Sequence, residues 1–354
     1  MELCLYHPEF GYYSRPVEQF GKGGDFYTSS DVHAVFGRLL ARQFEEMWRL
    51  LGAPEHIDLI ELGPGRGLFA LDVLDCCAKH FPEFARALRY GLVEQSVTLR
   101  TRLQERLDDR ISGGTAFIYD RLDEATSPAG NGLILFANEF FDALPVAIVD
   151  ARGVVRVSES EGTLREEFVA PSTEELEFLD RYGVHPVGKG RTEVSLGSVT
   201  WMKGIGAAFE DRCGFVVVVD YGYTREQQLA GRHLDTLMTY HKHRAGSSPY
   251  EAPGEQDITA HVNFTALESV AKDSGLEAVA LLTQSQFLLG IGEESQFQDA
   301  FEGCRLPQER AKVALQLKHL ISPDGMGEVF QVLILSHGVT KEKAARLSGL
   351  RFSR

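Results

Sequence analysis

A short apolar run that ends in a cluster of glycines constrains the fold of this chain more than any other feature. Residues 57–62 read Ile-Asp-Leu-Ile-Glu-Leu, and Gly-Pro-Gly-Arg-Gly follows at 63–67, before a stretch with helical spacing at 68–78. An apolar run of this length bounded by glycines is typical of a buried strand. Glycines allow a sharp turn into the helix and let a ligand approach the backbone closely. The segment therefore predicts an α/β fold with a ligand at the carboxyl end of a strand.

Strand-like and helical segments alternate along the rest of the chain. We expect six further strands, at Tyr90–Glu94, Ala116–Tyr119, Leu133–Ala137, Phe215–Asp220, Glu277–Leu282 and Val329–Ser336. Apolar residues at helical spacing indicate helices at 32–51, 97–107, 264–273 and 308–320. This alternation predicts an α/β fold with a mostly parallel, seven-stranded sheet that carries helices on both faces.

Two gaps in the alternation are too long for simple crossovers. At 146–213, β-like runs and acidic helical stretches predict an inserted subdomain, and the Gly-, Pro- and His-rich stretch at 221–262 predicts a lid-like insertion. We expect one domain over 1–354, comprising an N-terminal cover loop and helix (1–52), a cofactor-binding half of the core (57–145), the second half (214–338) and a C-terminal tail (339–354).

The charge and the cysteines restrict the class of partner. Lys and Arg number 36 against 51 Asp and Glu, so the net charge is −15, which argues against a general nucleic-acid or anionic-membrane binder. No apolar run approaches the roughly twenty residues of a spanning helix, so we expect no membrane insertion. We recognise no signal or transit peptide. The five cysteines form an odd set without Cys-x-x-Cys, so we expect a cytoplasmic location and no metal site.

The glycine spacing favours S-adenosyl-L-methionine over a dinucleotide as the ligand. A dinucleotide loop has its third glycine one residue later than Gly67. Glu61, at the strand end, would repel a pyrophosphate but suits the ammonium of a methionine moiety. Glu94 ends the second strand, where an acid is placed to accept hydrogen bonds from ribose hydroxyls. The alternatives are a tight strand-to-helix turn and a solvated glutamate.

A loop of unusual composition follows the fourth strand. Residues 138–142 read Asn-Glu-Phe-Phe-Asp, which places two acids, an amide and two aromatic rings at one strand end. Asn138 can accept from an N–H group, a phenylalanine can stack, and Glu139 and Asp142 can pair with a guanidinium. The loop therefore fits a planar nitrogen group. The alternative is that the aromatic rings belong to the core and Asp142 caps a turn.

Many segments, in their order and spacing, resemble the MidA family of S-adenosylmethionine-dependent methyltransferases, which includes mitochondrial complex I assembly methyltransferases. The matching segments include Leu5–Tyr13, Gly23–Ser29, Glu61–Gly67, Asn138–Val146, Asp220–Gly222 and Asp257–Phe264. The resemblance implies a Rossmann-like class I methyltransferase core and N-methylation of arginine on a protein. It further implies S-adenosyl-L-homocysteine as the product and a respiratory complex I subunit as the partner.

The resemblance also implies roles for single residues. By matching motif, Gly63, Gly65 and Gly67 line the cofactor, and Glu61 and Glu94 are its polar anchors. The loop at 24–29, with Asp25 and Thr28, resembles a cover over cofactor or substrate; an N-terminal turn that caps the next helix is the alternative.

For the reaction, we expect carboxylates against the non-reacting nitrogens of a guanidinium, because this cation is a poor nucleophile. Glu139 and Asp142 are the candidates, with Asn138 positioning the acceptor. His261 is a candidate proton acceptor or, equally, a hydrogen-bonded structural histidine. The competing functions are a nucleotide-binding oxidoreductase, a non-catalytic cofactor-binding assembly factor, and an N-methyltransferase for another planar nitrogen.

Overall fold

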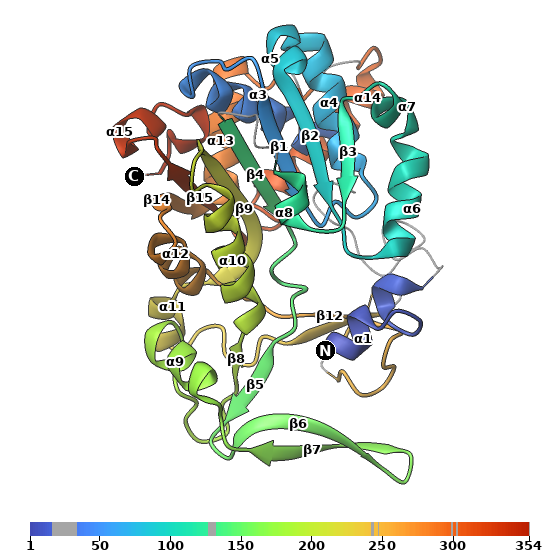
Figure 1. Cartoon of the computed structure of the whole chain (residues 1–354), viewed down its shortest axis with the longest axis vertical. Coiled ribbons are helices and arrows are strands. Elements are labelled where there is room, and N and C mark those ends of the chain that lie inside the picture. The colour runs from blue at the N-terminus through green and yellow to red at the C-terminus, as the bar shows by residue number, and fades with distance from the viewer. Residues whose placement is uncertain are drawn as a thin grey trace.

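The computed structural model describes residues 1–15, 34–126, 132–241, 244–246, 248–298, 300–301 and 304–353 (Figure 1). Its central sheet has the strand order β14-β15-β9-β4-β1-β2-β3, and a two-residue strand, β13 (Val262–Asn263), pairs with β9 as an eighth strand beyond the seven expected. The strands are β1 (Ile57–Leu62), β2 (Leu88–Val93), β3 (Ala116–Tyr119), β4 (Gly132–Asn138), β9 (Cys213–Tyr223), β14 (Glu277–Thr283) and β15 (Phe330–His337). Neighbours from β9 to β3 are parallel, and β15 is antiparallel to both of its neighbours. The mostly parallel α/β sheet expected from the sequence is confirmed.

Helices cover both faces of this sheet, which is why all six residues of β1 are buried. Leu59 points into the cluster on one face, and Ile60 into the cluster on the other. The first face is covered by α3 (Ala34–Leu50), α4 (Leu68–His80), α5 (Pro82–Ala87), α6 (Val97–Arg106), α13 (Gln284–Ser295) and α14 (Pro307–Ile321). The second is covered by α8 (Leu122–Ala125), α10 (Leu196–Ala208) and α12 (Phe264–Asp273).

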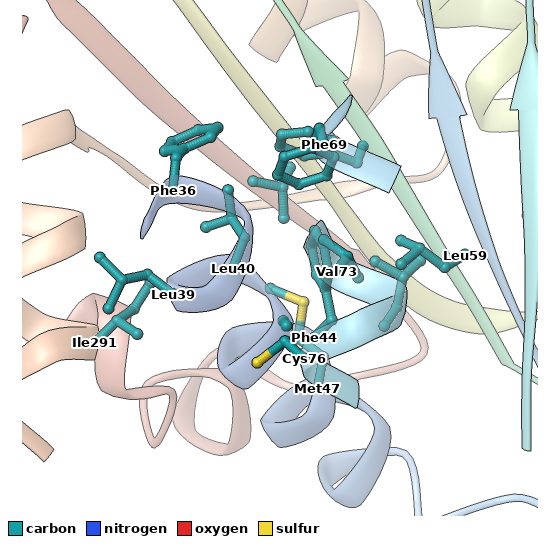
Figure 2. Packing of buried hydrophobic residues seen from close by; sticks show 14 of the residues in the cluster. Phe36, Leu39, Leu40, Phe44, Met47, Leu59, Phe69, Val73, Cys76 and Ile291 are labelled. Atoms are coloured by element: carbon teal, nitrogen blue, oxygen red, sulfur yellow. The ribbon is translucent and has the colours of Figure 1, made fainter. Parts of the chain in front are cut away.

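Aromatic packing between α3, α4 and β4 holds the helix that follows the glycine loop. Phe69, the second residue of α4, stacks on Phe136 of β4 with ring centroids 4.5 Å apart. Phe44 of α3 meets both rings edge-on. Figure 2 shows Phe44 of α3 directed toward Val73 and Cys76 of α4, whereas Leu39 is directed toward Ile291 of α13. The apolar stripe that predicted α3 is thus its core face, and its hydrophobic contacts hold the helix that follows the loop.

Two insertions carry sheets of their own. Between β4 and β9, the order β7-β6-β5-β8 joins β5 (Ala147–Asp150), β6 (Gly153–Ser160), β7 (Thr163–Val169) and β8 (Thr192–Val194), with α9 (Thr173–Arg181) beside them. The β6–β7 hairpin extends away from the central sheet (Figure 1). After β9 and α11 (Arg225–Leu229), the antiparallel strands β10 (Met238–His241), β11 (Arg244–Gly246) and β12 (Asp257–Thr259) form the lid sheet, which a short β13 (Val262–Asn263) follows.

Residues 1–15 lie against the lid sheet. They form α1 (Glu2–Tyr6) and the 3-10 turn η1 (Tyr12–Ser14), and Leu5 and Tyr12 share a small buried cluster with Ile258 of β12. The expected cover loop, with Asp25 and Thr28, lies outside the described residues. The shorter remaining helices are α7 (Asp108–Ser112), α15 (Lys341–Ala344) and the 3-10 turn η3 (Ser348–Leu350). No helix in the described ranges is long and apolar enough to cross a bilayer.

Candidate active site

A cavity of about 1260 Å³ lies at the carboxyl ends of β1, β2, β4 and β9. Parallel strands bring their carboxyl ends to one edge of a sheet, so the loops that follow them meet there. Eight residues singled out in the sequence line this cavity: Glu61, Gly63, Gly65, Glu94, Asn138, Glu139, Asp142 and His261. The structure therefore brings the glycine loop and the loop after β4 into one site.

The glycines of the loop differ in their surroundings. Gly63 has a φ of 62°, and a Cβ there would lie 2.9 Å from Cδ2 of Phe140, so both the backbone and the space favour glycine. Gly67 also has positive φ, but a Cβ would meet Leu103 of α6 at 2.7 Å. Gly67 is absent from the described cavity lining. Its hydrogen atom therefore allows close helix packing, whereas Gly63 and Gly65 border the cavity.

Two glutamates lie at the ends of β1 and β2. Glu61 is 4% exposed and accepts a hydrogen bond of 2.8 Å from the hydroxyl of Tyr90, and its burial raises its pKa to about 8. Glu94 accepts from the backbone N–H of Ser96 at 2.8 Å, and its removal from bulk water raises its pKa to about 7. A buried carboxylate is costly without a counter-charge. A ligand with a cationic group or several donors would stabilise both residues.

The loop after β4 presents an amide and a carboxylate side by side. Nδ2 of Asn138 donates to Oε1 of Glu139 at 3.1 Å, and Oδ1 of Asn138 is buried without a hydrogen-bond partner among the described residues. Glu139 has a φ of 50°, a conformation that non-glycine residues seldom adopt. Next to it, Phe140 meets Trp201 edge-on with centroids 4.9 Å apart, and Phe141 is buried in the core.

Asp142 is held by two residues of β9. Its Oδ2 accepts from the hydroxyl of Tyr221, and Oδ1 is buried without a hydrogen-bond partner in the described part of the chain. Burial raises the pKa of Asp142 to about 6, and the Tyr221 hydrogen bond opposes that rise. Asp220 accepts from the backbone N–H groups of Phe141 and Asp142 at 3.1 and 3.3 Å. These bonds fix the loop with one carboxylate oxygen of Asp142 unused.

His261 lies on the cavity wall behind Tyr221. Its ring meets Tyr221 edge-on at 5.3 Å, and its Nδ1 lies 3.1 Å from Nδ1 of His233. Burial, and then the nearby His233, lower the pKa of His261 to about 4. The imidazole is therefore neutral at physiological pH. Its role as proton acceptor stays a prediction.

Sequence reasoning left several lining residues without a role. These are Tyr6 and Tyr13 from the N-terminal residues, Tyr221 from β9, and Tyr240 and Asp257 from the lid sheet. The end of β9 could have been noticed, because Asp220 ends an expected strand and Tyr221 follows it, much as Asn138 and Glu139 follow the expected strand at Leu133–Ala137. The others come from short segments whose sequence does not indicate which strand end they approach.

The described lining is strongly acidic. It contains six carboxylates (Glu2, Glu61, Glu94, Glu139, Asp142 and Asp257) and one guanidinium, that of Arg66. Across the described residues, no group of three or more His, Cys, Asp or Glu side chains is arranged to hold a metal ion. The acidic lining complements a positively charged ligand.

Comparisons with known proteins agree with this geometry. Residues 39–281 match the model of a family described as "Putative S-adenosyl-L-methionine-dependent methyltransferase". The chain is 30% identical to the "Protein arginine methyltransferase NDUFAF7 homolog, mitochondrial" of Drosophila melanogaster, over 96% of this chain and 80% of that protein. It is 27% identical to the Danio rerio protein arginine methyltransferase NDUFAF7, over 94% and 81%.

A solved structure is similar over the whole chain. It is a "likely methyl transferase" from Burkholderia thailandensis bound to S-adenosyl-homocysteine, 28% identical, with a TM-score of 0.78 and coverage of 100% of this chain and 89% of that one. Because the match includes the inserted segments, the likeness extends beyond the central sheet.

The relatives correct one expectation. The cytoplasmic location inferred from the start of the chain is wrong on this comparison, because the curated relatives from Drosophila melanogaster, Danio rerio and Homo sapiens are named as mitochondrial proteins. A signal judged from a few N-terminal residues does not establish the compartment.

Proposed function

The chain belongs to this family of S-adenosyl-L-methionine-dependent methyltransferases, and we propose that it methylates an arginine nitrogen on a protein. The observation that carries the proposal is the placement of Glu139 and Asp142 in the cavity that also holds the glycine loop. The names of the relatives, which are protein arginine methyltransferases, support it. By the resemblance to the MidA family, we propose a respiratory complex I subunit as the acceptor.

We assign the cofactor half of the cavity to Glu61, Gly63, Gly65 and Glu94. When bound, S-adenosyl-L-methionine supplies an electrophilic methyl group on a sulfonium. The buried carboxylate of Glu61 suits the ammonium of the methionine moiety, and Glu94 suits the ribose hydroxyls. A Cβ at Gly63 would press on Phe140. The absence of a side chain there therefore leaves room for the ligand beside these acids.

We assign the acceptor half to Asn138, Glu139 and Asp142. A guanidinium spreads its charge over three nitrogens, so none of them is a good nucleophile. Carboxylates against the two non-reacting nitrogens draw the positive charge toward themselves and orient the third nitrogen. Glu139 and Asp142 both line the cavity and are the candidates for this task.

The reaction must also release one proton. A guanidinium nitrogen that gains a methyl group loses an N–H proton, and the doubly charged species that would otherwise form is a strong acid. Asp142, with a pKa of about 6, is ionised at neutral pH and lines the cavity. We infer Asp142 rather than His261 as the acceptor, because its carboxylate is the stronger base: the pKa of His261 is about 4.

The test is transfer of an isotopically labelled methyl group from the cofactor into protein of a mitochondrial or bacterial lysate, followed by mass spectrometry of the labelled peptides. We expect methylarginine. Glu139→Gln and Asp142→Asn should each lower turnover by about 100-fold while cofactor affinity stays within twofold. Label found only on lysine or only in small molecules would overturn the arginine proposal, as would full activity in both variants.

A further inference from the structure

Residues 1–15 supply a wall of the cavity that the central sheet does not. The hydroxyl of Tyr6 donates to the backbone carbonyl of Ala143, in the loop after β4, at 2.8 Å. The hydroxyl of Tyr13 donates to Oδ1 of Asp257, on the lid strand β12, at 2.9 Å. The two tyrosine rings stack with centroids 5.6 Å apart and an interplanar angle of 29°. This segment therefore joins the acceptor loop to the lid.

The same segment is tied to the cofactor half. Oγ of Ser96, at the N-terminus of α6, donates to the carbonyl of Tyr13 at 2.9 Å, and Oγ1 of Thr98 donates to the carbonyl of Ser14 at 3.2 Å. These contacts place the tyrosines next to the segment that follows Glu94. The stacked rings thus lie where the cofactor half and the acceptor half of the cavity meet.

Asp257 adds an acid from the lid. It is 1% exposed and lines the cavity together with Tyr240, its register partner on β10. The pKa of Tyr6 is raised by burial, and further by Asp257, Asp142 and Glu94. The pKa of Tyr240 is raised by burial, then by Asp142, Asp257 and Glu139. Carboxylates from the lid and from the loop after β4 therefore act on the same tyrosines.

We propose that Tyr6, Tyr13 and Asp257 form a second wall of the acceptor site and select a planar guanidinium over an ammonium. The inference rests on the proposed arginine acceptor and names residues outside the loop after β4. A guanidinium has five N–H donors in a plane and stacks on aromatic faces, whereas an ammonium is a compact, strongly hydrated charge. The stacked tyrosines supply the flat face, Asp257 accepts the in-plane donors, and Tyr13 positions Asp257.

The test separates the two halves of the cavity by using three ligands. The first is a nitrogen analogue of S-adenosyl-L-homocysteine that carries a short guanidinoalkyl chain in place of the transferred methyl group. The second carries an aminoalkyl chain of equal length, and the third is S-adenosyl-L-homocysteine itself. Isothermal titration calorimetry measures the dissociation constant of each for the full chain and its variants.

We expect the wild type to bind the guanidino ligand more tightly than the amino ligand. Asp257→Asn should weaken the guanidino ligand by about tenfold or more, the effect of losing a hydrogen bond to a charged group. Tyr6→Leu should remove the preference for guanidino over amino, and Tyr13→Phe should weaken the guanidino ligand severalfold. All three variants should bind S-adenosyl-L-homocysteine within about twofold of the wild type, which also shows that they are folded.

The matched control is Tyr250→Phe. Tyr250 also donates its hydroxyl to a carboxylate, that of Glu166 at 2.8 Å, but it lies in the lid insertion outside the described cavity lining. The Tyr250→Phe variant should bind all three ligands with the affinities of the wild type. If the Tyr6 and Asp257 variants keep the full guanidino preference while Glu139→Gln loses it, the second wall is refuted and the arginine proposal stands. If the wild type shows no guanidino preference, the arginine proposal fails as well.

Discussion

The hydroxyl of Tyr221 donates to one oxygen of the Asp142 carboxylate, although the two residues are 79 positions apart in the chain. Asp142 lines the cavity, and its other oxygen is buried without a hydrogen-bond partner in the described ranges. The Tyr221 hydrogen bond therefore orients a buried acid at the cavity wall. It also links the ionisation of Asp142 to the end of β9.

Tyr221→Phe should therefore change the pH dependence of turnover. The Tyr221 hydrogen bond lowers the pKa of Asp142, which lies at about 6, so its loss raises that pKa. Because the ionised form is the active one, we expect the acid limb of the kcat profile to move to higher pH, with cofactor affinity unchanged. Initial rates between pH 5 and 9 measure the shift. An acid limb that stays at the same pH would contradict a role for Asp142 in catalysis.

Cofactor binding should release protons near neutral pH. Without a ligand, burial holds the pKa of Glu61 at about 8, so this group is largely protonated at pH 7. A cationic ammonium favours the ionised form and lowers the pKa, so affinity should rise as the pH rises from 6 to 8. Calorimetry in two buffers of different ionisation enthalpy counts the protons. Glu61→Gln should lower the number of protons released on cofactor binding, because the glutamine cannot ionise. An unchanged number would contradict the assignment of Glu61 to the ammonium group.

Gly63→Ala should lose cofactor affinity, whereas Gly114→Ala should not. Both glycines have positive φ, 62° and 71°, so both alanines pay the left-handed strain of about 1–2 kcal/mol. Only at Gly63 would the new Cβ meet a neighbour, Phe140 at 2.9 Å; at Gly114 nothing lies within 4 Å. Thermal melting should show a loss from backbone strain in both variants and a further loss from the Phe140 contact in Gly63→Ala. Equal cofactor affinity in the two would contradict the assignment of the loop.

Phe44→Ala should destabilise the whole fold by about 3–5 kcal/mol, the usual cost of removing a buried aromatic ring. Phe44 is 0% exposed and packs edge-on against Phe69 and Phe136, which fix the helix after the glycine loop. Urea unfolding measures the loss. Phe352→Ala, at a ring 41% exposed, is the control and should change stability by less than about 0.5 kcal/mol. A similar loss in the two variants would contradict this account of the core.

The parts of the site that are continuous in sequence could be predicted from it. Strand, glycine loop and helix follow one another at 57–80, and Glu139 and Asp142 share one loop, so local pattern was sufficient. The Tyr13–Asp257 contact spans 244 positions and depends on a lid strand of three residues, too short to give a periodic signal. Likewise, the glycine spacing predicts the same role beside the cofactor for Gly63 and Gly67. Only the position of α6, which packs against Gly67, distinguishes the two glycines.

The strand order explains why the sequence alone does not place other residues in the site. Asp220 and Tyr221 lie at the carboxyl end of a strand that the sequence identifies, but the place of this strand beside β4 depends on how the chain crosses the sheet. The domain boundaries stay a prediction, although separate sheets lie within 146–213 and 221–262 as the two long gaps indicated.

The acidic lining of the cavity also distinguishes the cofactor before the reaction from the cofactor after it. Methyl transfer converts a sulfonium into a neutral sulfide, so the nucleotide ligand loses one positive charge in a cavity lined by six acidic side chains. The attraction that gathers the reactants therefore weakens at the moment of turnover, which favours departure of the spent nucleotide. The affinity ratio of S-adenosyl-L-methionine to S-adenosyl-L-homocysteine measures the effect of this lost charge. The ratio should fall toward one as the pH is lowered and the cavity carboxylates are protonated. A ratio independent of pH would contradict this electrostatic account of product release.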